Sequence, residues 1–234
     1  TNGFTNNGTI ELTAINGTGS YAYLEVTNGT LVNAPGATIL SSPGTGGQRY
    51  LYANVDNQGT LTVGQTLEIN HASGVYTNSG VLDVSGGDLT LNQSGTTPSF
   101  TNTGTITIGT GRTFLVDYGV LNQNAGTIGG AGTLSLYSVV VNFATDFSNA
   151  TTGLTSAYST FNGPGALINA AGKTLALNYG TVNAPLNNLG TLNIGYYVAV
   201  NGALTTGTGS TIRLQGNNTY GAAQLTVLNG FTNN

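Results

Sequence analysis

The 234-residue sequence contains no Cys, Met or Trp, and it holds only four Lys+Arg, eight Asp+Glu and one His. Without Cys the chain forms neither disulfides nor thiolate metal sites. Its net charge of −4 leaves no basic surface for neutralising phosphates, so we expect no nucleic-acid partner. No stretch approaches the ~20 consecutive apolar residues of a membrane-spanning helix, so this segment is expected to make no membrane contact.

The missing Met also bears on where these residues stand in a gene. An open reading frame begins with Met, so we expect the chain to be an internal fragment or repeat unit of a longer one. Residues 2–7, Asn-Gly-Phe-Thr-Asn-Asn, return unchanged at 229–234. This identity favours a tandem array, although Phe-Thr-Asn is also a common opening of the repeat, as at Phe100. The expected partner is then the chain itself, through end-to-end continuation or a homopolymeric fibre.

What the sequence has in abundance is a short repeat. The pattern Asn-x-Gly-(Thr/Val)-(Leu/Ile) recurs, and the gaps between its glycines correspond to one, two or three units of roughly 21–25 residues. The glycines of this motif are Gly8, Gly59, Gly80, Gly104, Gly126 and Gly190.

A second motif, a Gly followed by alternating polar and apolar residues, occurs within each unit. Alternation with a period of two indicates short strands with one apolar and one polar face, and no stretch has the 3.6-residue period of a helix. Gly and Asn at the strand ends supply the turns. The second motif occupies residues 64–69, 87–91, 111–116, 132–136, 172–177 and 209–214.

Short strands at this spacing fit either an antiparallel sandwich or a parallel solenoid. The near-constant unit length with one motif order favours the solenoid. We therefore predict an all-β, right-handed parallel β-helix in which residues 1–234 form one continuous segment of roughly 10–11 coils of about 21–25 residues. The recurrent Asn residues are candidates for stacked amide ladders. Residues 41–47 are predicted to form an inserted loop, and residues 142–161 form either a side loop or coils whose motif has drifted.

Two stretches carry a resemblance to a known group. Phe100–Ile108 and Asn124–Leu136 resemble the passenger repeats of large bacterial surface proteins, the autotransporter and filamentous-haemagglutinin-like adhesins. The resemblance implies a right-handed parallel β-helix, export to the bacterial cell surface, and a role in adhesion or in an extracellular fibre. It supplies no shared catalytic signature.

The residues themselves offer little for catalysis, and we expect no enzyme activity, no catalytic residue, no metal site and no cofactor. Glycoside hydrolysis needs two carboxylates about 5–10 Å apart. Asp83 and Asp88 lie on different strands of one coil and are interpreted as solvated surface charges, and His71 is the only histidine. The outward positions of equivalent strands are predicted to carry Glu11, Thr62, Asp83, Thr107 and Asn193, with no two acids adjacent.

Tyrosine gives the one pattern typical of ligand recognition. In Tyr21-Ala-Tyr23 and Tyr50-Leu-Tyr52 the neighbouring apolar residues take the inward face, so both pairs are predicted to project outward, 29 residues apart. A stacked aromatic platform of Tyr21, Tyr23, Tyr50 and Tyr52 would bind sugar rings of surface glycans. The alternative is that these rings pack on each other across coils and stiffen the surface.

The sequence therefore predicts a structural shaft or fibre-forming, adhesive segment of a large exported bacterial surface protein. A glycan-binding module that uses the tyrosine platform is the second interpretation. A polysaccharide lyase or hydrolase is the third.

Overall fold

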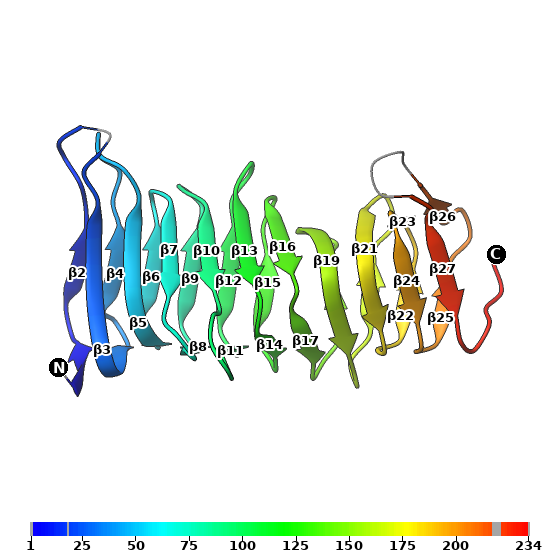
Figure 1. The fold of residues 1–234 in the computed structure, drawn as a ribbon, viewed down its shortest axis with the longest axis horizontal. Helices are drawn as coiled ribbons and strands as arrows, with labels where there is room; N and C mark the ends of the chain where they lie inside the picture. The colour runs from blue at the N-terminus through cyan, green and yellow to red at the C-terminus, as the bar shows by residue number, and fades with distance from the viewer. Residues whose placement is uncertain (1, 18, 217–220, 234) are drawn as a thin grey trace.

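The computed structural model of the chain describes residues 2–17, 19–216 and 221–233. These residues form a parallel β-solenoid of about nine complete turns, with partial turns at both ends. In Figure 1 the near strands run downward while the chain advances from the N-terminus at the left to the C-terminus at the right, so the winding is right-handed. The predicted all-β solenoid is confirmed. No helix in the described part is long and apolar enough to cross a membrane.

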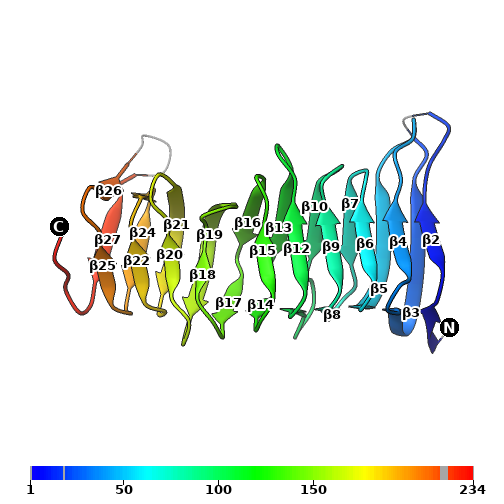
Figure 2. The same cartoon turned by 180° about the vertical axis from the view of Figure 1, so that it is seen from behind.

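Three strand positions, which we call the first, second and third faces, recur in each turn. The first and second faces belong to one 17-stranded sheet, and the third face is built from a six-stranded and a four-stranded sheet on the opposite side of the rod (Figures 1 and 2). First-face strands are β7 (Leu67–Asn70), β10 (Leu89–Asn92), β13 (Thr113–Asp117), β16 (Thr133–Tyr137), β23 (Thr191–Ile194) and β26 (Thr211–Leu214). Second-face strands are β1 (Asn2–Asn6), β8 (Val75–Asn78), β11 (Ser99–Asn102), β14 (Val120–Gln123), β17 (Val140–Phe143), β24 (Tyr197–Val200) and β27 (Gln224–Val227).

Four longer strands bend from the first face onto the second. They are β3 (Ala22–Asn33), β5 (Arg49–Asn57), β19 (Gly153–Asn162) and β21 (Thr174–Val182). Third-face strands are β2 (Thr9–Leu12), β4 (Thr38–Ser41), β6 (Thr60–Val63), β9 (Val81–Val84), β12 (Thr105–Ile108), β15 (Thr127–Gly129), β18 (Phe147–Ser148), β20 (Leu167–Asn169), β22 (Leu186–Asn188) and β25 (Leu204–Thr206).

One apolar core runs through the rod. Each strand pairs in parallel with the same strand of the next turn, so inward side chains of one row lie directly above one another. One such row joins Leu67, Leu89, Phe114 and Leu134, all of them buried. Because every turn shares its core with both neighbours, the turns stabilise one another and no turn folds alone.

The two irregular regions have different structures. Ser42–Gln48 connects β4 to β5 as a loop, as predicted. Arg49, fully buried, holds this loop through hydrogen bonds from its guanidinium to the carbonyl oxygens of Gly47 and Ser42. Residues 142–161, in contrast, continue the stack as the end of β17, then β18 and most of β19. They are coils whose motif has drifted and not a side loop.

A ladder of buried amides explains the Asn of the first motif. At the corner between the second and third faces, the Nδ2 of Asn57 donates to the Oδ1 of Asn78 at 2.7 Å, and Asn78 donates in the same way to Asn102 at 2.8 Å. The ladder begins with Asn6 and Asn33. A buried amide without such partners would be destabilising, so the stacking fixes the alignment of successive turns.

The Gly of the same motif has a steric role. A Cβ at Gly104 would collide with the carbonyl oxygen of Gly80, and a Cβ at Gly80 would collide with that of Gly59. The backbones of successive turns therefore touch at this corner, which only glycine allows.

The ladder changes corner halfway along the rod. Its last member is Gln123, and the motif residue Asn124 is exposed, because the turn from Gln123 to Gly126 is one residue longer. One turn later the equivalent position holds Phe143. This ring stacks on Phe147 and Phe161 at centroid distances of 5.3 and 6.1 Å, and all three are buried.

Beyond these rings a second ladder forms at the corner between the third and first faces. There Asn149 donates to Asn169 at 2.9 Å, and Asn169 donates to Asn188 at 2.6 Å. The interpretation of Asn188-Leu189-Gly190 as the same turn as the other motif copies is therefore wrong, since it lies at a different corner.

The two identical hexapeptides differ in conformation. Residues 2–6 form β1 and pair with β3, whereas 229–233 follow β27 without forming a strand. Asn229 there donates to the carbonyl oxygen of Asn201 at 2.9 Å. Asn234 lies outside the described residues, and the tandem array stays a prediction.

Replacing Asn78 by Ala tests the buried ladder. Asn78→Ala removes the acceptor of Asn57 and the donor to Asn102 inside the protein, so unfolding should become easier by about 1–3 kcal/mol. For a chain of this size that corresponds to a fall of about 2–12 °C in melting temperature. Thermal unfolding followed by circular dichroism measures it.

Asn201→Ala is the matched control. The Asn201 amide donates to Asn183 at 2.9 Å in an equivalent stack, but this stack is exposed. Water replaces the lost bond there, so the melting temperature should change little. Equal losses in the two variants would contradict a special role for burial.

Candidate functional site

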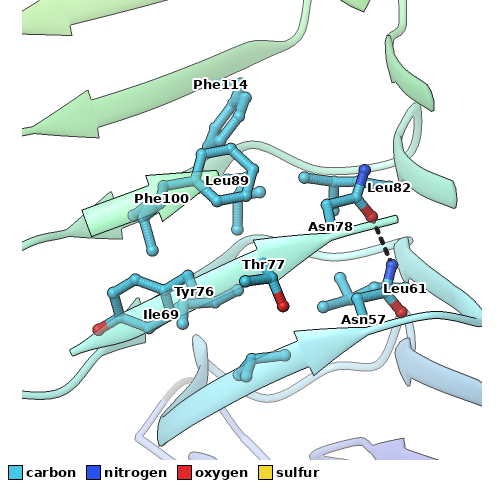
Figure 3. Close-up of a pocket in the computed structure, with 12 residues that line it drawn as sticks. Asn57, Leu61, Ile69, Tyr76, Thr77, Asn78, Leu82, Leu89, Phe100 and Phe114 are labelled. Carbon is cyan, nitrogen blue, oxygen red and sulfur yellow. Dashed lines mark hydrogen bonds between the residues drawn. The ribbon is translucent and has the colours of Figure 1, made fainter. Parts of the chain in front are cut away.

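The interior of the rod holds one small hollow. Its volume is about 30 Å³, and its lining includes Tyr76, Leu89, Phe100 and Phe114 (Figure 3). A hollow of this size accommodates at most one or two water molecules, and its walls are almost wholly apolar. It is a packing gap of the core and not a ligand site.

The carboxylates do not form a catalytic pair among the described residues. Asp83 lies on the third face in β9, whereas Asp88 precedes β10 and accepts a hydrogen bond from the Thr113 amide at 2.8 Å. The predicted outward row on the third face is right for four of its five members, and Leu40 also belongs to it; Asn193 lies on the first face, in β23, and its assignment was wrong.

The structure gives no metal-binding cluster within its described ranges. No group of three or more His, Asp or Glu side chains comes together there. The only histidine, His71, lines a shallow hollow of about 350 Å³ with Glu25, Tyr52 and Asn70, and its buried Nδ1 has no hydrogen-bond partner among the described residues.

The predicted tyrosine platform lies on the first face, at the N-terminal end of the rod. Tyr21 and Tyr23 are 57% and 68% exposed, and Tyr50 and Tyr52 are half-buried. Tyr50 contacts Tyr21 at a centroid distance of 5.9 Å with tilted planes, and it stacks on Tyr52 at 5.5 Å. Three of the four rings thus contact one another, and Tyr23 makes no ring contact with them.

The register of the platform differs from the predicted 29-residue offset. Tyr23 pairs with Tyr50 and Glu25 with Tyr52, an offset of 27 residues, because β3 contains a bulge between Glu25 and Thr30. An acidic side chain therefore stands beside Tyr52. Burial raises the pKa of the Tyr52 hydroxyl, and the negative charges of Glu68 and Glu25 add to the effect.

A second and longer set of tyrosines, which the sequence analysis missed, lies on the corner between the first and second faces. We call it the tyrosine row. Ring centroids of neighbouring members are 4.6–6.0 Å apart, so the contacts run without a break over five turns. The row consists of Tyr118, Tyr137, Tyr158, Tyr179, Tyr196 and Tyr197.

The backbone at this corner explains how the rings are presented. Tyr118, Tyr158 and Tyr179 have φ values of 63°, 57° and 51°, a left-handed conformation that bulky residues rarely adopt. Three consecutive strained corners persist only where the surroundings favour them. Here the gain is ring packing across turns, which offsets the strain.

The two halves of the tyrosine row differ in what they leave accessible. Tyr158, Tyr179 and Tyr196 are parallel within 9° at 4.6 and 4.9 Å, so they cover one another's faces. Tyr137 meets Tyr118 at 89° and Tyr158 at 67°, and these edge contacts leave ring faces open to solvent. Only the tilted half therefore offers aromatic surface to a ligand.

A signal for the tyrosine row was present in the sequence. Its members are separated by 19, 21, 21 and 18 residues from Tyr118 to Tyr197, close to one turn each. The signal was missed because Tyr158 falls in the stretch where the main motif drifts.

The comparisons with known proteins return no relative: no protein-family model, no curated protein and no solved structure matches this chain. The fold and the side chains on its surface are therefore the only basis for a functional assignment.

Tyr76 supplies a pH test of the core. Its ring is buried, its hydroxyl donates to the His71 carbonyl oxygen at 3.3 Å, and burial raises its pKa from 10.0 to about 12. The folded state therefore holds this proton more tightly than the unfolded chain does. The resulting stability is fully present below pH 10 and is lost as the pH rises through about 12.

Melting temperatures measured between pH 8 and 12 (about the range of tyrosine ionisation) test this expectation. The wild type should lose stability in the alkaline part of the range, and Tyr76→Phe should lose less. Tyr23→Phe, at an exposed ring, should follow the wild type. Identical alkaline losses in the wild type and Tyr76→Phe would contradict the assignment.

Proposed function

We propose that this chain is a structural shaft, a rod segment of a large exported bacterial surface protein that acts in a fibre or in adhesion. The observation that carries the proposal is the continuity of stacking. Parallel pairing, the core and the amide ladders pass from turn to turn along the described rod. Such a design produces length, since each added turn extends the molecule by about 4.8 Å.

The surface supports the same function. Charged residues make up 5% of the chain, and exposed Asn side chains bond to one another across turns, as Asn142 does to Asn122 at 2.8 Å. Polar groups of this kind are used internally to join turns. The carboxylates are scattered, which agrees with a non-enzymatic role and makes a polysaccharide-cleaving activity the weakest of the three interpretations.

Location and self-association are part of the proposal. The resemblance of Phe100–Ile108 and Asn124–Leu136 to adhesin passenger repeats supports an extracellular position on a bacterial surface. The parallel stacking supports association of the shaft with further turns of its own kind. No cofactor enters the proposal.

Immunogold electron microscopy of the native source tests the shaft directly. Antibodies raised against the folded chain should label surface fibres on intact cells, because the segment is proposed to lie outside the cell. Labelling that appears only after the cells are permeabilised would contradict it. A strain lacking the gene serves as the control.

A glycan-binding module is the second candidate, and the open rings of the tyrosine platform favour it. Tyr21 and Tyr23 are the two most exposed platform rings, and Glu25 and Glu68 provide hydrogen-bond acceptors beside Tyr52. If the platform binds glycans, Tyr21→Ala combined with Tyr52→Ala should abolish signals on a glycan array. Signals unchanged in this double variant would leave the rings with a packing role only.

A further inference from the structure

A notch interrupts the outward side chains of the first face, on the flank of the tyrosine row. The outward row of successive turns reads Asp117, Tyr137, Ala157 and Asn178, which are direct cross-strand neighbours. Ala157 is the one small residue between three larger side chains. The surface is hollowed at this point.

Two shallow hollows meet at the notch. One, of about 360 Å³, extends past Asp117, Leu115 and Tyr118, and the other, of about 720 Å³, extends along Tyr158 and Tyr179. Both are lined by Tyr137, Ala157 and Asn178. Together they form a groove along the rod. Asp117 and Asn178 lie three turns apart, so the groove is about 14 Å long between them.

The walls of the notch combine an aromatic ring with unused polar groups. Tyr137 is 41% exposed, and its edge contacts with Tyr118 and Tyr158 leave aromatic surface open. Among the described residues, neither the Asp117 carboxylate nor the Asn178 amide has a side-chain hydrogen bond. In the exposed Asn stack of the second face, by contrast, the amides bond to one another, as Asn162 does to Asn142 at 3.0 Å.

The sheet restricts what kind of ligand the notch accepts. The strands beneath it, β13, β16, β19 and β21, are each paired with a strand on both sides, so their backbone groups are already hydrogen-bonded. A peptide cannot add itself as a further strand here. Recognition must use side chains alone, through an aromatic surface with acceptors and an amide at its ends.

We propose that the groove centred on Tyr137, Ala157 and Asn178 is a binding site for a neutral polysaccharide. A sugar ring places its apolar C–H face on Tyr137 and occupies the notch at Ala157. Its hydroxyl groups donate to the carboxylate of Asp117 and exchange hydrogen bonds with the amide of Asn178. A neutral sugar fits because an anionic one would be repelled by Asp117, and no cation lines either hollow.

This site is separate from the predicted platform of Tyr21, Tyr23, Tyr50 and Tyr52, and it does not depend on the shaft role. Binding by the purified chain is its only requirement. A shaft located anywhere would still show it, so failure of the surface labelling leaves this proposal intact and failure of binding leaves the shaft intact.

Titration of the full chain with soluble neutral oligosaccharides, of β-linked glucose and of N-acetylglucosamine, tests the proposal. Tyrosine fluorescence reports binding, since the chain contains no Trp, and calorimetry measures the affinity. We expect saturable binding to at least one of the two sugars. Tyr137→Ala should weaken it by about tenfold or more, because a buried aromatic contact and its hydrogen-bonded surroundings are lost.

Ala157→Leu fills the notch without removing any contact group, and it should also abolish binding. Tyr23→Ala removes an exposed platform ring and should leave the affinity unchanged. Melting curves of the variants show whether the fold is intact, and Tyr137→Phe, which keeps the ring, should retain most of the affinity.

Three results would overturn the proposal. One is the absence of binding to both oligosaccharides. Another is binding that survives Tyr137→Ala and Ala157→Leu but is lost in Tyr23→Ala, since the platform would then be the site. The third is stronger binding of a basic peptide that is also lost in Ala157→Leu, which would assign the notch to a protein partner.

Discussion

The close parallel stacking of one turn on the next is the constraint on which this molecule depends. Turns approach so closely at one corner that only glycine fits, and the side-chain amides of Asn57, Asn78 and Asn102 then bond to one another inside the protein. A one-residue slip between turns would place outward polar residues in the core and leave these amides unpaired. The ladder therefore specifies the register as well as adding to stability.

The same constraint explains where the pattern changes. A buried polar ladder ends without penalty only if its last member finds another partner, and Gln123 does so by donating to the carbonyl oxygens of Ala125 and Gly126. The three stacked rings of Phe143, Phe147 and Phe161 then fill the corner, and the amides resume at the corner between the third and first faces. On the outside, stacking brings tyrosines one turn apart into a row, so the groove is a by-product of the same geometry.

Much of the fold followed from the sequence, and the reasons for the failures are physical. Period-two alternation and a constant unit length predict parallel stacked strands, and inward Asn78 was correctly grouped with stacking residues. The spacing of a motif does not say which corner it occupies, so Asn188 was assigned to the wrong one. The platform rings were predicted to project outward, which they do, but the bulge in β3 moved Tyr50 opposite Tyr23. The notch was not predictable, since Ala157 matters only through its neighbours two turns on either side.

Hydrogen exchange of side-chain amides, followed by NMR, tests the central claim most directly. If buried ladders hold the turns in register, the Nδ2 protons of Asn57, Asn78 and Asn102 should exchange as slowly as the backbone amides of the core. Those of the exposed stack at Asn183 and Asn201 should exchange rapidly. Equal exchange rates for the amides of Asn78 and Asn201 would contradict the account.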